Sequence, residues 1–303
     1  MRVEQQTPNR IVGLSCSLFG YSRQAYYQRL KEQEKDAFQE ELIVQEVLRY
    51  RKLQKRIGAR KLYGLMHNFF TNHGINMGRD AFFNTLRDNA LLVRIRKRKS
   101  ITTDSKHPYR KYANLIKEFI PLGPSQLWVS DITYINIGNG FGYLNLITDA
   151  FSRKIVGFCL SKTLSAKGTI WALKQAIKSN PNFSQLIHHS DRGVQYCCTD
   201  YVAVLKKNEI MISMTENGDP LENAIAERVN GILKTELLEK SYTSFEKAQI
   251  GIAMAINTYN YLRPHNSISN MTPIEVHCLD NEIKLKRLWK NYFKTQKKEV
   301  FME

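Results

Sequence analysis

Hydrophobic residues in the first hundred positions recur at the three- and four-residue spacing of amphipathic helices. Leu62, Leu65, Met66 and Phe69 form the clearest stripe, and Ser22 is a candidate N-cap for an earlier helix. The expected helical stretches are residues 14–30, 32–55, 57–70 and 77–92. A tight turn that contains glycine joins the last two, so the pattern predicts an all-α region with helix-turn-helix units.

The pattern changes to strand-like runs after Pro124. The first three runs are rich in β-branched and aromatic residues and are separated by short turns, so they predict an antiparallel meander. Two further short runs then alternate with helical stretches at residues 165–179 and 199–210. The five expected strands lie at residues 126–137, 143–151, 152–161, 185–191 and 212–216. This order predicts an α/β fold with a mixed five-stranded sheet flanked by helices.

Two more helices are expected, one that begins near Asn223 and one over residues 244–261. At about 100° per residue, the apolar residues of the first fall on one side. They are Ile225, Val229, Ile232, Leu233 and Leu237. Glu227 lies opposite them, and Lys234 projects within about 20° of Glu227 because it follows seven residues later. The helix therefore presents a carboxylate and an ammonium group away from the core.

The charge balance points to a polyanionic partner. The chain has 45 Lys and Arg against 28 Asp and Glu, a net charge of +17, and such an excess favours nucleic acid. Basic residues are densest between positions 94 and 111, where helical periodicity is lost. This segment predicts a linker that lies along DNA phosphates, although a solvated connector would have the same composition.

Candidate DNA contacts are the basic residues that fall outside the apolar stripes. In the helical region we select Arg60, Lys61 and Arg79, with a helical bundle that has a solvated basic face as the alternative. Arg192 and Arg263 are candidates in the mixed region, and Arg263 is equally suited to ordering the end of a helix. The linker candidates are Arg94, Arg96, Lys97, Arg98 and Lys99.

Cysteine usage and hydropathy indicate the compartment. The five cysteines form no Cys-x-x-Cys pair, which argues against a disulfide framework or a cysteine-rich zinc site and is typical of a reducing cytoplasm. The N-terminus lacks the apolar segment of a signal peptide, and no run reaches the length of a membrane span. We therefore expect a cytoplasmic protein with no membrane partner.

Three acidic residues supply the candidate chemistry. Asp131 and Asp191 lie in strand-like runs, and Glu227 follows Asp191 after 35 residues (227 − 191 − 1). Three carboxylates on separate elements suit a pair of Mg²⁺ or Mn²⁺ ions, which activate an oxygen nucleophile and stabilise a reacting phosphate. We expect the oxygens of all three to lie within reach of a shared metal pair. Without metal, mutual repulsion should loosen or partly protonate the site. His188 and His189 precede Asp191 on an apolar run and are expected to be structural.

The motifs around these acids resemble the catalytic second-frame protein of the insertion-sequence-three family of bacterial transposases. The matching stretches lie between Trp128 and Glu275 and include W-x-x-D-I-T-Y, H-S-D-R-G-x-Q-Y, E-N-A-x-A-E-R-x-x-x-x-L-K-x-E and Y-N-x-x-R-P-H. The resemblance implies a retroviral-integrase-like core of the ribonuclease-H type. It also implies that Asp131, Asp191 and Glu227 are the catalytic, metal-binding triad and that Lys234 contacts substrate DNA.

The same resemblance implies metal-dependent cleavage at the ends of an insertion sequence, followed by strand transfer from the exposed 3′-hydroxyl. The implied partners are terminal inverted repeats, target DNA, further copies of the chain on DNA and an upstream-frame protein, joined as a fusion or bound. A non-catalytic DNA-binding regulator and a structure-selective nuclease remain alternatives. The predicted organisation is a helical DNA-binding region at 1–93, a basic linker at 94–123, an integrase-like core at 124–280 and a basic tail at 281–303.

Overall fold

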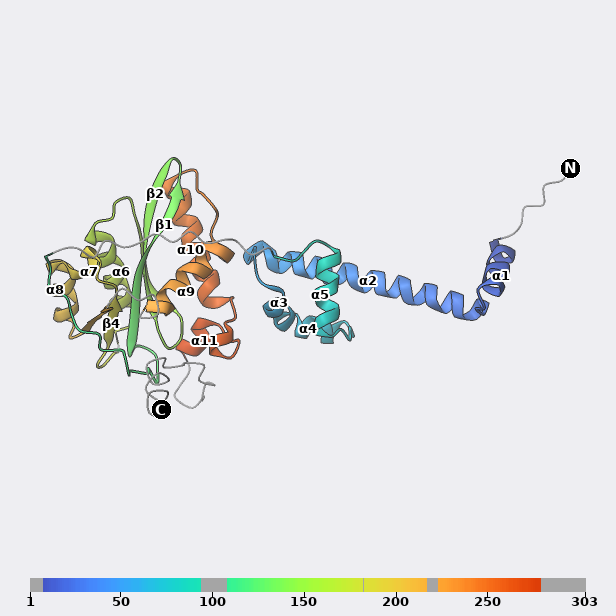
Figure 1. The fold of residues 1–303 in the computed structure, drawn as a ribbon, viewed down its shortest axis with the longest axis horizontal. Coiled ribbons are helices and arrows are strands. Elements are labelled where there is room, and N and C mark those ends of the chain that lie inside the picture. The colour runs from blue at the N-terminus through green and yellow to red at the C-terminus, as the bar shows by residue number, and fades with distance from the viewer. Residues whose placement is uncertain (1–7, 94–107, 182, 217–222, 279–303) are drawn as a thin grey trace, which may run out of the picture. The chain divides into compact units, whose positions relative to one another are not determined.

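The structure, a computed structural model, describes residues 8–93, 108–181, 183–216 and 223–278 (Figure 1). The chain divides into two compact units, Met1–Leu53 with Ile57–Arg94 and Gln54–Arg56 with Ile95–Glu303. The described part of the first unit is helical, and the second unit contains the sheet. The five linker candidates at positions 94–99 and the predicted basic tail lie outside the described residues.

Helices make up the described part of the first unit, and all but one of them are short. Its described helices are α1 (Pro8–Leu18), α2 (Arg23–Leu53), α3 (Ala59–Leu65), α4 (His67–Asn72) and α5 (Arg79–Asp88). A buried cluster that includes Val47, Leu62 and Phe82 joins the end of α2 to α3 and α5. Gly74 lies in the turn between α4 and α5 with φ of +62°, a conformation that glycine adopts without strain. The predicted arrangement of short helices around a glycine-containing turn is confirmed.

Helix α2 differs from the prediction in its length. The backbone N–H of Ala25 donates to Ser22 Oγ at 3.1 Å, which confirms Ser22 as the cap of this helix. The helix then runs for 31 residues, whereas two stretches with a boundary near residue 31 were expected. Residues 31–41 contain no glycine or proline and are rich in Lys, Glu and Gln, which are strong helix formers. Nothing in that segment ends the helix.

A five-stranded sheet organises the second unit. Its strands are β1 (Leu127–Ile137), β2 (Gly140–Asp149), β3 (Ile155–Ser161), β4 (Ile187–Ser190) and β5 (Met211–Met214), in the order β3-β2-β1-β4-β5. The first three strands form an antiparallel meander, while β4 is parallel to β1 and β5 is parallel to β4. This topology confirms the predicted mixed sheet and is that of a ribonuclease-H-like fold.

Helices cover both faces of this sheet (Figure 1). On one face, α6 (Ala166–Ser179), α7 (Val194–Cys197) and α8 (Thr199–Lys207) enclose a core that includes Trp128, Leu173 and Tyr201. On the other, α9 (Ala224–Ile232) and α10 (Phe245–Tyr261) enclose Leu144, Leu233 and Ile252. Because β1 is packed on both sides, its position relative to β4 and α9 is fixed.

The C-terminal part of this unit contains an irregular helix. A π-helix, η2 (Leu233–Leu237), continues α9, and the N–H of Leu238 donates to the carbonyl of Leu233 at 2.8 Å. Short π segments inside helices are often found at functional sites. After α10 come the 3-10 helix η3 (Asn266–Ile268) and α11 (Pro273–His277). Among the described helices, none is both long and apolar enough to cross a membrane.

Candidate active site

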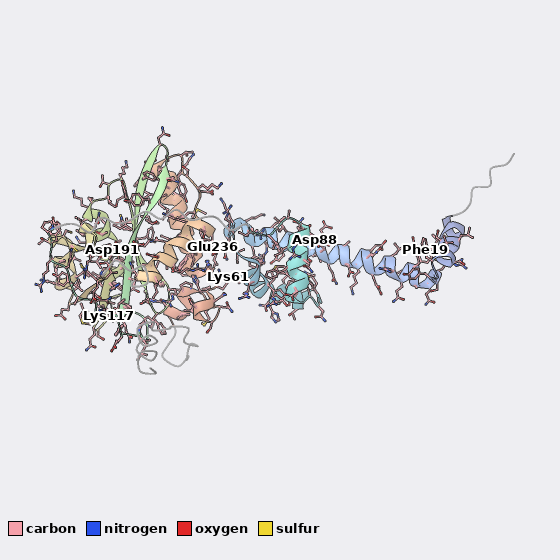
Figure 2. The ribbon with its side chains drawn as sticks, viewed as in Figure 1. Phe19, Lys61, Asp88, Lys117, Asp191 and Glu236 are labelled. Atoms are coloured by element: carbon pink, nitrogen blue, oxygen red, sulfur yellow. The ribbon has the colours of Figure 1, made fainter. Side chains whose placement is uncertain are left out.

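The parallel pairing of β1 and β4 brings two of the predicted acids together. Leu127 pairs with Ile187, an offset of 60 positions (187 − 127), and Val129 pairs with His189. Asp191, labelled in Figure 2, directly follows β4. When the register is continued by two residues, Asp191 falls beside Asp131. Residues at the same register of parallel strands point to the same face. The two carboxylates therefore share one side of the sheet.

Helix α9 is attached to β1 by two buried asparagines. Asn223 Nδ2 donates to the carbonyl of Ser130 at 3.0 Å, and Asn230 Nδ2 donates to Asp131 Oδ2 at 2.6 Å. Glu227 lies between these two attachment points in the sequence and is exposed, while Val229 of the same helix is buried. The predicted polar face of α9 is therefore directed at the strand that holds Asp131.

Burial and like charges set the protonation of Asp131. Burial is the largest cause that raises the pKa of this carboxyl, to about 7, and the charges of Asp191 and Glu227 add to it. Hydrogen bonds from Asn230 and from the backbone N–H of Ile132 oppose the shift. Asp131 is therefore substantially protonated at neutral pH, as expected for three neighbouring carboxylates without a cation.

The donor set at this place fits a hard divalent cation. Asp131, Asp191 and Glu227 supply carboxylate oxygens, which Mg²⁺ and Mn²⁺ prefer. The side-chain oxygens of Asn223 and Asn230 are buried and accept no hydrogen bond from the described part of the chain. However, no group of three His, Cys, Asp or Glu side chains among the described residues forms a complete metal site. The convergence of Asp131, Asp191 and Glu227 on a shared metal pair stays a prediction.

The integrase core domain family matches residues 121–220, and a second integrase core family matches residues 208–273. An uncharacterized 31 kDa protein of insertion element IS600 from Shigella sonnei is 31% identical over 85% of this chain and 95% of its own length. A putative transposase for IS986/IS6110 from Mycobacterium tuberculosis is 30% identical over 73% of this chain and 81% of its own. The transposase InsF of IS3A from Escherichia coli is 30% identical over 62% of this chain and 67% of its own length.

The chain belongs to the IS3 family of transposases. It is a DNA transposase with an integrase core, and such a core depends on divalent metal ions. This confirms the predicted enzyme class over the non-catalytic regulator. Among solved structures, the catalytic core of HTLV-2 integrase in complex with magnesium is similar, with a TM-score of 0.42 and 23% identity over 52% of this chain and 98% of that one.

Lys234 of the transposase lies on the π-helix η2, close to the acidic residues. Partial burial lowers the pKa of its ammonium group, and the charge of Asp131 opposes that shift. The side chain is nevertheless exposed at the surface. An ammonium group in this position is able to contact a phosphate that approaches Asp131.

The two histidines before Asp191 are structural, as predicted. His188 and His189 are almost completely buried. His188 Nε2 lies 2.9 Å from the Tyr201 hydroxyl, and burial lowers the pKa of His188 to about 3, so the ring is neutral. His189 Nδ1 lies 2.8 Å from Ser213 Oγ on the neighbouring strand β5.

Tyr196 also lies at the site, although it is not among the residues predicted from the sequence. Its hydroxyl accepts a hydrogen bond from Ser130 Oγ at 3.3 Å. Burial raises the pKa of Tyr196 well above its usual value, and the charges of Asp191 and Asp131 contribute. The phenol is therefore a neutral group beside both aspartates. Tyr196 could have been predicted because it ends the H-S-D-R-G-x-Q-Y motif, which also contains Asp191.

Most of the predicted DNA contacts that the structure describes lie at or near the surface. Arg60 and Arg79 are exposed on α3 and α5, and Lys61, which is labelled in Figure 2, is partly buried. Arg79 Nε also pairs with the adjacent Asp80 at 3.0 Å. Arg192 is partly buried directly after Asp191. These placements are compatible with DNA contact and with a solvated basic surface alike.

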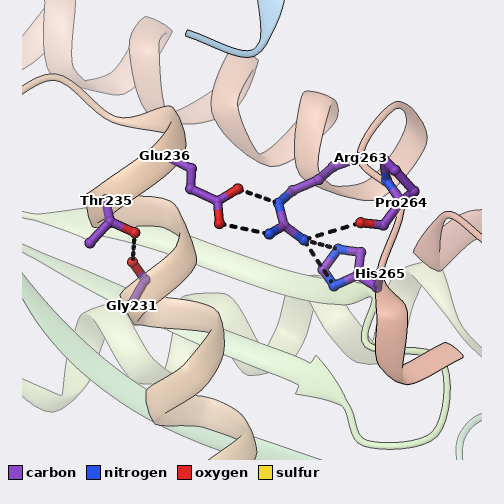
Figure 3. Close-up of polar contacts among 6 residues, drawn as sticks. All are labelled: Gly231, Thr235, Glu236, Arg263, Pro264 and His265. Carbon is purple, nitrogen blue, oxygen red and sulfur yellow. Dashed lines mark hydrogen bonds and ion pairs between the residues drawn. The ribbon is translucent and has the colours of Figure 1, made fainter. Parts of the chain in front are cut away.

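Arg263 is the exception, and its predicted DNA contact does not fit the structure. Its side chain is 2% exposed and forms two hydrogen bonds with the Glu236 carboxylate, at 2.8 and 2.9 Å. Its Nη1 lies 3.1 and 3.2 Å from the ring nitrogens of His265 (Figure 3). Because the guanidinium is buried and paired, DNA cannot reach it in this conformation. The alternative prediction, that Arg263 orders a helix end, agrees with these contacts.

Proposed function

We propose that this transposase cleaves one DNA strand at each end of its insertion sequence and joins the new 3′-hydroxyl to target DNA. Asp131, Asp191 and Glu227 are the residues that would hold Mg²⁺ or Mn²⁺ at this site. By analogy with other phosphoryl-transfer sites, two such ions would bind. They would activate the oxygen nucleophile and stabilise the leaving oxygen. The observation that supports this assignment best is the parallel β1–β4 register, which continues to Asp131 and Asp191, together with the hydrogen bond from Asn230 of α9 to Asp131.

The chain's own residues have distinct roles in this proposal. Asn230 holds one oxygen of Asp131, and Asn223 holds the start of α9, so Glu227 keeps its position relative to β1. Lys234 contacts a phosphate oxygen of the cleaved strand and offsets the charge that develops there. The buried phenol of Tyr196 is neutral and accepts a hydrogen bond from Ser130, the residue before Asp131, so it supports this part of β1 without adding charge.

Recognition of the ends is assigned to the helical unit. Arg60 and Arg79 lie in the first turns of α3 and α5, and both are exposed. We infer that this unit binds the terminal inverted repeats and that the linker basic residues follow the phosphates. Two ends must be held together before joining, so the active species is an oligomer on DNA, formed by this chain alone or with the upstream-frame protein.

Removal of the metal should separate binding from cleavage. With Mg²⁺ present, the protein is expected to nick a duplex that carries the terminal repeat, and excess EDTA should abolish nicking because the carboxylates alone cannot activate water or an alcohol. Gel-shift binding to the same duplex should persist in EDTA, and added Mg²⁺ or Mn²⁺ should restore nicking. Nicking that continues unchanged in EDTA would contradict the proposal.

A further inference from the structure

Helix α6 has one buried face and one exposed face. Thr169, Ala172, Leu173 and Ala176 are buried against the sheet and the neighbouring helices. The opposite face consists of exposed side chains only, namely Lys167, Trp171, Lys174 and Lys178. At about 100° per residue these four fall within an arc of about 60°, so they form a single stripe. We call this stripe the α6 basic face.

The α6 basic face is held rigidly because the helix lies close to the sheet. A Cβ atom at Gly157 of β3 would collide with the carbonyl oxygen of Ala172. A Cβ atom at Gly168 of α6 would collide with the hydroxyl of Ser161. Contacts this close leave the helix little freedom to rotate. The outward direction of the stripe is therefore fixed by the core.

The exposure of Trp171 is unusual for its residue type. Its relative exposure is 70%, whereas Trp128 in the core is fully buried. Large aromatic side chains are usually buried or placed where they contact a partner. In the described structure, Trp171 stacks on no other ring and the three lysines form no ion pair. The helix also contains no acidic residue that could neutralise them.

We propose that the α6 basic face binds a DNA strand whose bases are unpaired, with Trp171 stacked on one base and the lysines on the flanking phosphates. An indole face stacks on any unpaired base, whereas the bases of an intact duplex are not accessible to it. Between Lys167 and Lys178 the helix rises about 16 Å, which matches about five nucleotides at 3.4 Å each. The proposal rests on the DNA-cleaving function above and adds a second contact for strands opened near the cut.

Charge favours DNA over a second copy of the same chain. A two-fold axis through this face would bring the lysines of two copies opposite one another, and like charges placed together across an interface are repulsive. A polyanion, by contrast, gains from releasing its counterions when it meets three lysines. We therefore expect DNA, and not a second copy of the chain, to occupy the α6 basic face.

Binding to two labelled DNAs tests the proposal with the full-length protein. One is a blunt duplex with the terminal repeat, and the other is the same duplex with an unpaired arm of about ten nucleotides. Trp171→Ala should weaken binding of the forked DNA about 5- to 100-fold, and Trp171→Phe should retain most of it. Replacing the three lysines with glutamine should lower the slope of log K against log salt by about 2 on the forked DNA. A Lys206→Gln, Lys207→Gln variant of α8 is the control and should change neither value in this way.

Two results would overturn the proposal. The first is that the wild type binds forked and blunt DNA with the same affinity and that Trp171→Ala changes neither affinity. The second is a change in sedimentation mass in Trp171→Ala without a change in forked-DNA affinity, which would assign the face to a second copy. Mg²⁺-dependent nicking of the blunt duplex is measured in parallel. Nicking that is intact in Trp171→Ala upholds the proposed function even if the α6 basic face fails, whereas no nicking by the wild type removes the function itself.

Discussion

Asp131→Asn should abolish strand cleavage while leaving the fold and the binding of DNA ends intact. The carboxylate accepts a hydrogen bond from Asn230 and is near enough to Asp191 and Glu227 for their charges to raise its pKa. An amide cannot serve as an anionic metal ligand there. Loss of such a group should lower the rate on the order of 1,000-fold or more, measured as nicking of a terminal-repeat duplex in Mg²⁺. The metal-free protein should not lose stability, since the amide is isosteric and removes repulsion from two neighbouring charges.

The same expectation holds for Asp191→Asn and Glu227→Gln, which remove the other two carboxylates. Asp200→Asn is a matched control, because it makes the same chemical change at an exposed residue of α8. It should cleave at the wild-type rate. If Asp131→Asn cleaved within about threefold of wild type, a difference of less than about 1 kcal/mol, Asp131 would not be a catalytic residue.

Arg263→Met should cause the largest loss of stability among single substitutions at the predicted site residues. The change leaves the carboxylate of Glu236, which is 21% exposed, without the two hydrogen bonds it now accepts. Breaking a buried pair in this way costs about 3–5 kcal/mol of unfolding free energy. In a unit of this size the midpoint of thermal unfolding should fall by about 6–20 °C.

A double-substitution cycle separates pairing from simple loss of the side chain. Glu236→Leu with Arg263→Met should recover much of the loss, because replacing both partners by apolar groups avoids a buried unpaired charge. Arg60→Met is the control at an exposed arginine and should shift the unfolding free energy by no more than about 0.5 kcal/mol. A double variant as unstable as Arg263→Met would show that packing of the arginine, and not its ion pair, stabilises the region.

The strands and the polar face of α9 could be predicted because their signals are local. In β1, β-branched and aromatic residues surround Asp131, and in α9 the apolar residues fall on one side of a regular helix. The proximity of Asp131 and Asp191 is different, since it depends on the register between two strands about 60 positions apart. The sequence suggested it through the family resemblance, and the β1–β4 pairing supplies its physical basis.

The features that escaped prediction depend on distant parts of the chain. For Arg263 the sequence left a DNA contact and the ordering of a helix end as alternatives, because its burial depends on Glu236, which lies 27 positions away on a π-helix. The wider turn of that helix changes the direction of every side chain after Ile232, so a projection at a constant angle per residue fails there. The role of Asn230 likewise appears only when α9 is placed against β1.

Strand joining is the most direct test of the account. A labelled terminal-repeat duplex with a free 3′-hydroxyl is incubated with the full-length protein, Mg²⁺ and a plasmid target. We expect labelled plasmid in which the element 3′-end is covalently attached to target DNA, and we expect no such product with Asp131→Asn or in EDTA. Hydrolytic cleavage by the wild type without any label in the plasmid would contradict it, because the site would then be that of a nuclease and not of a strand-transferring transposase.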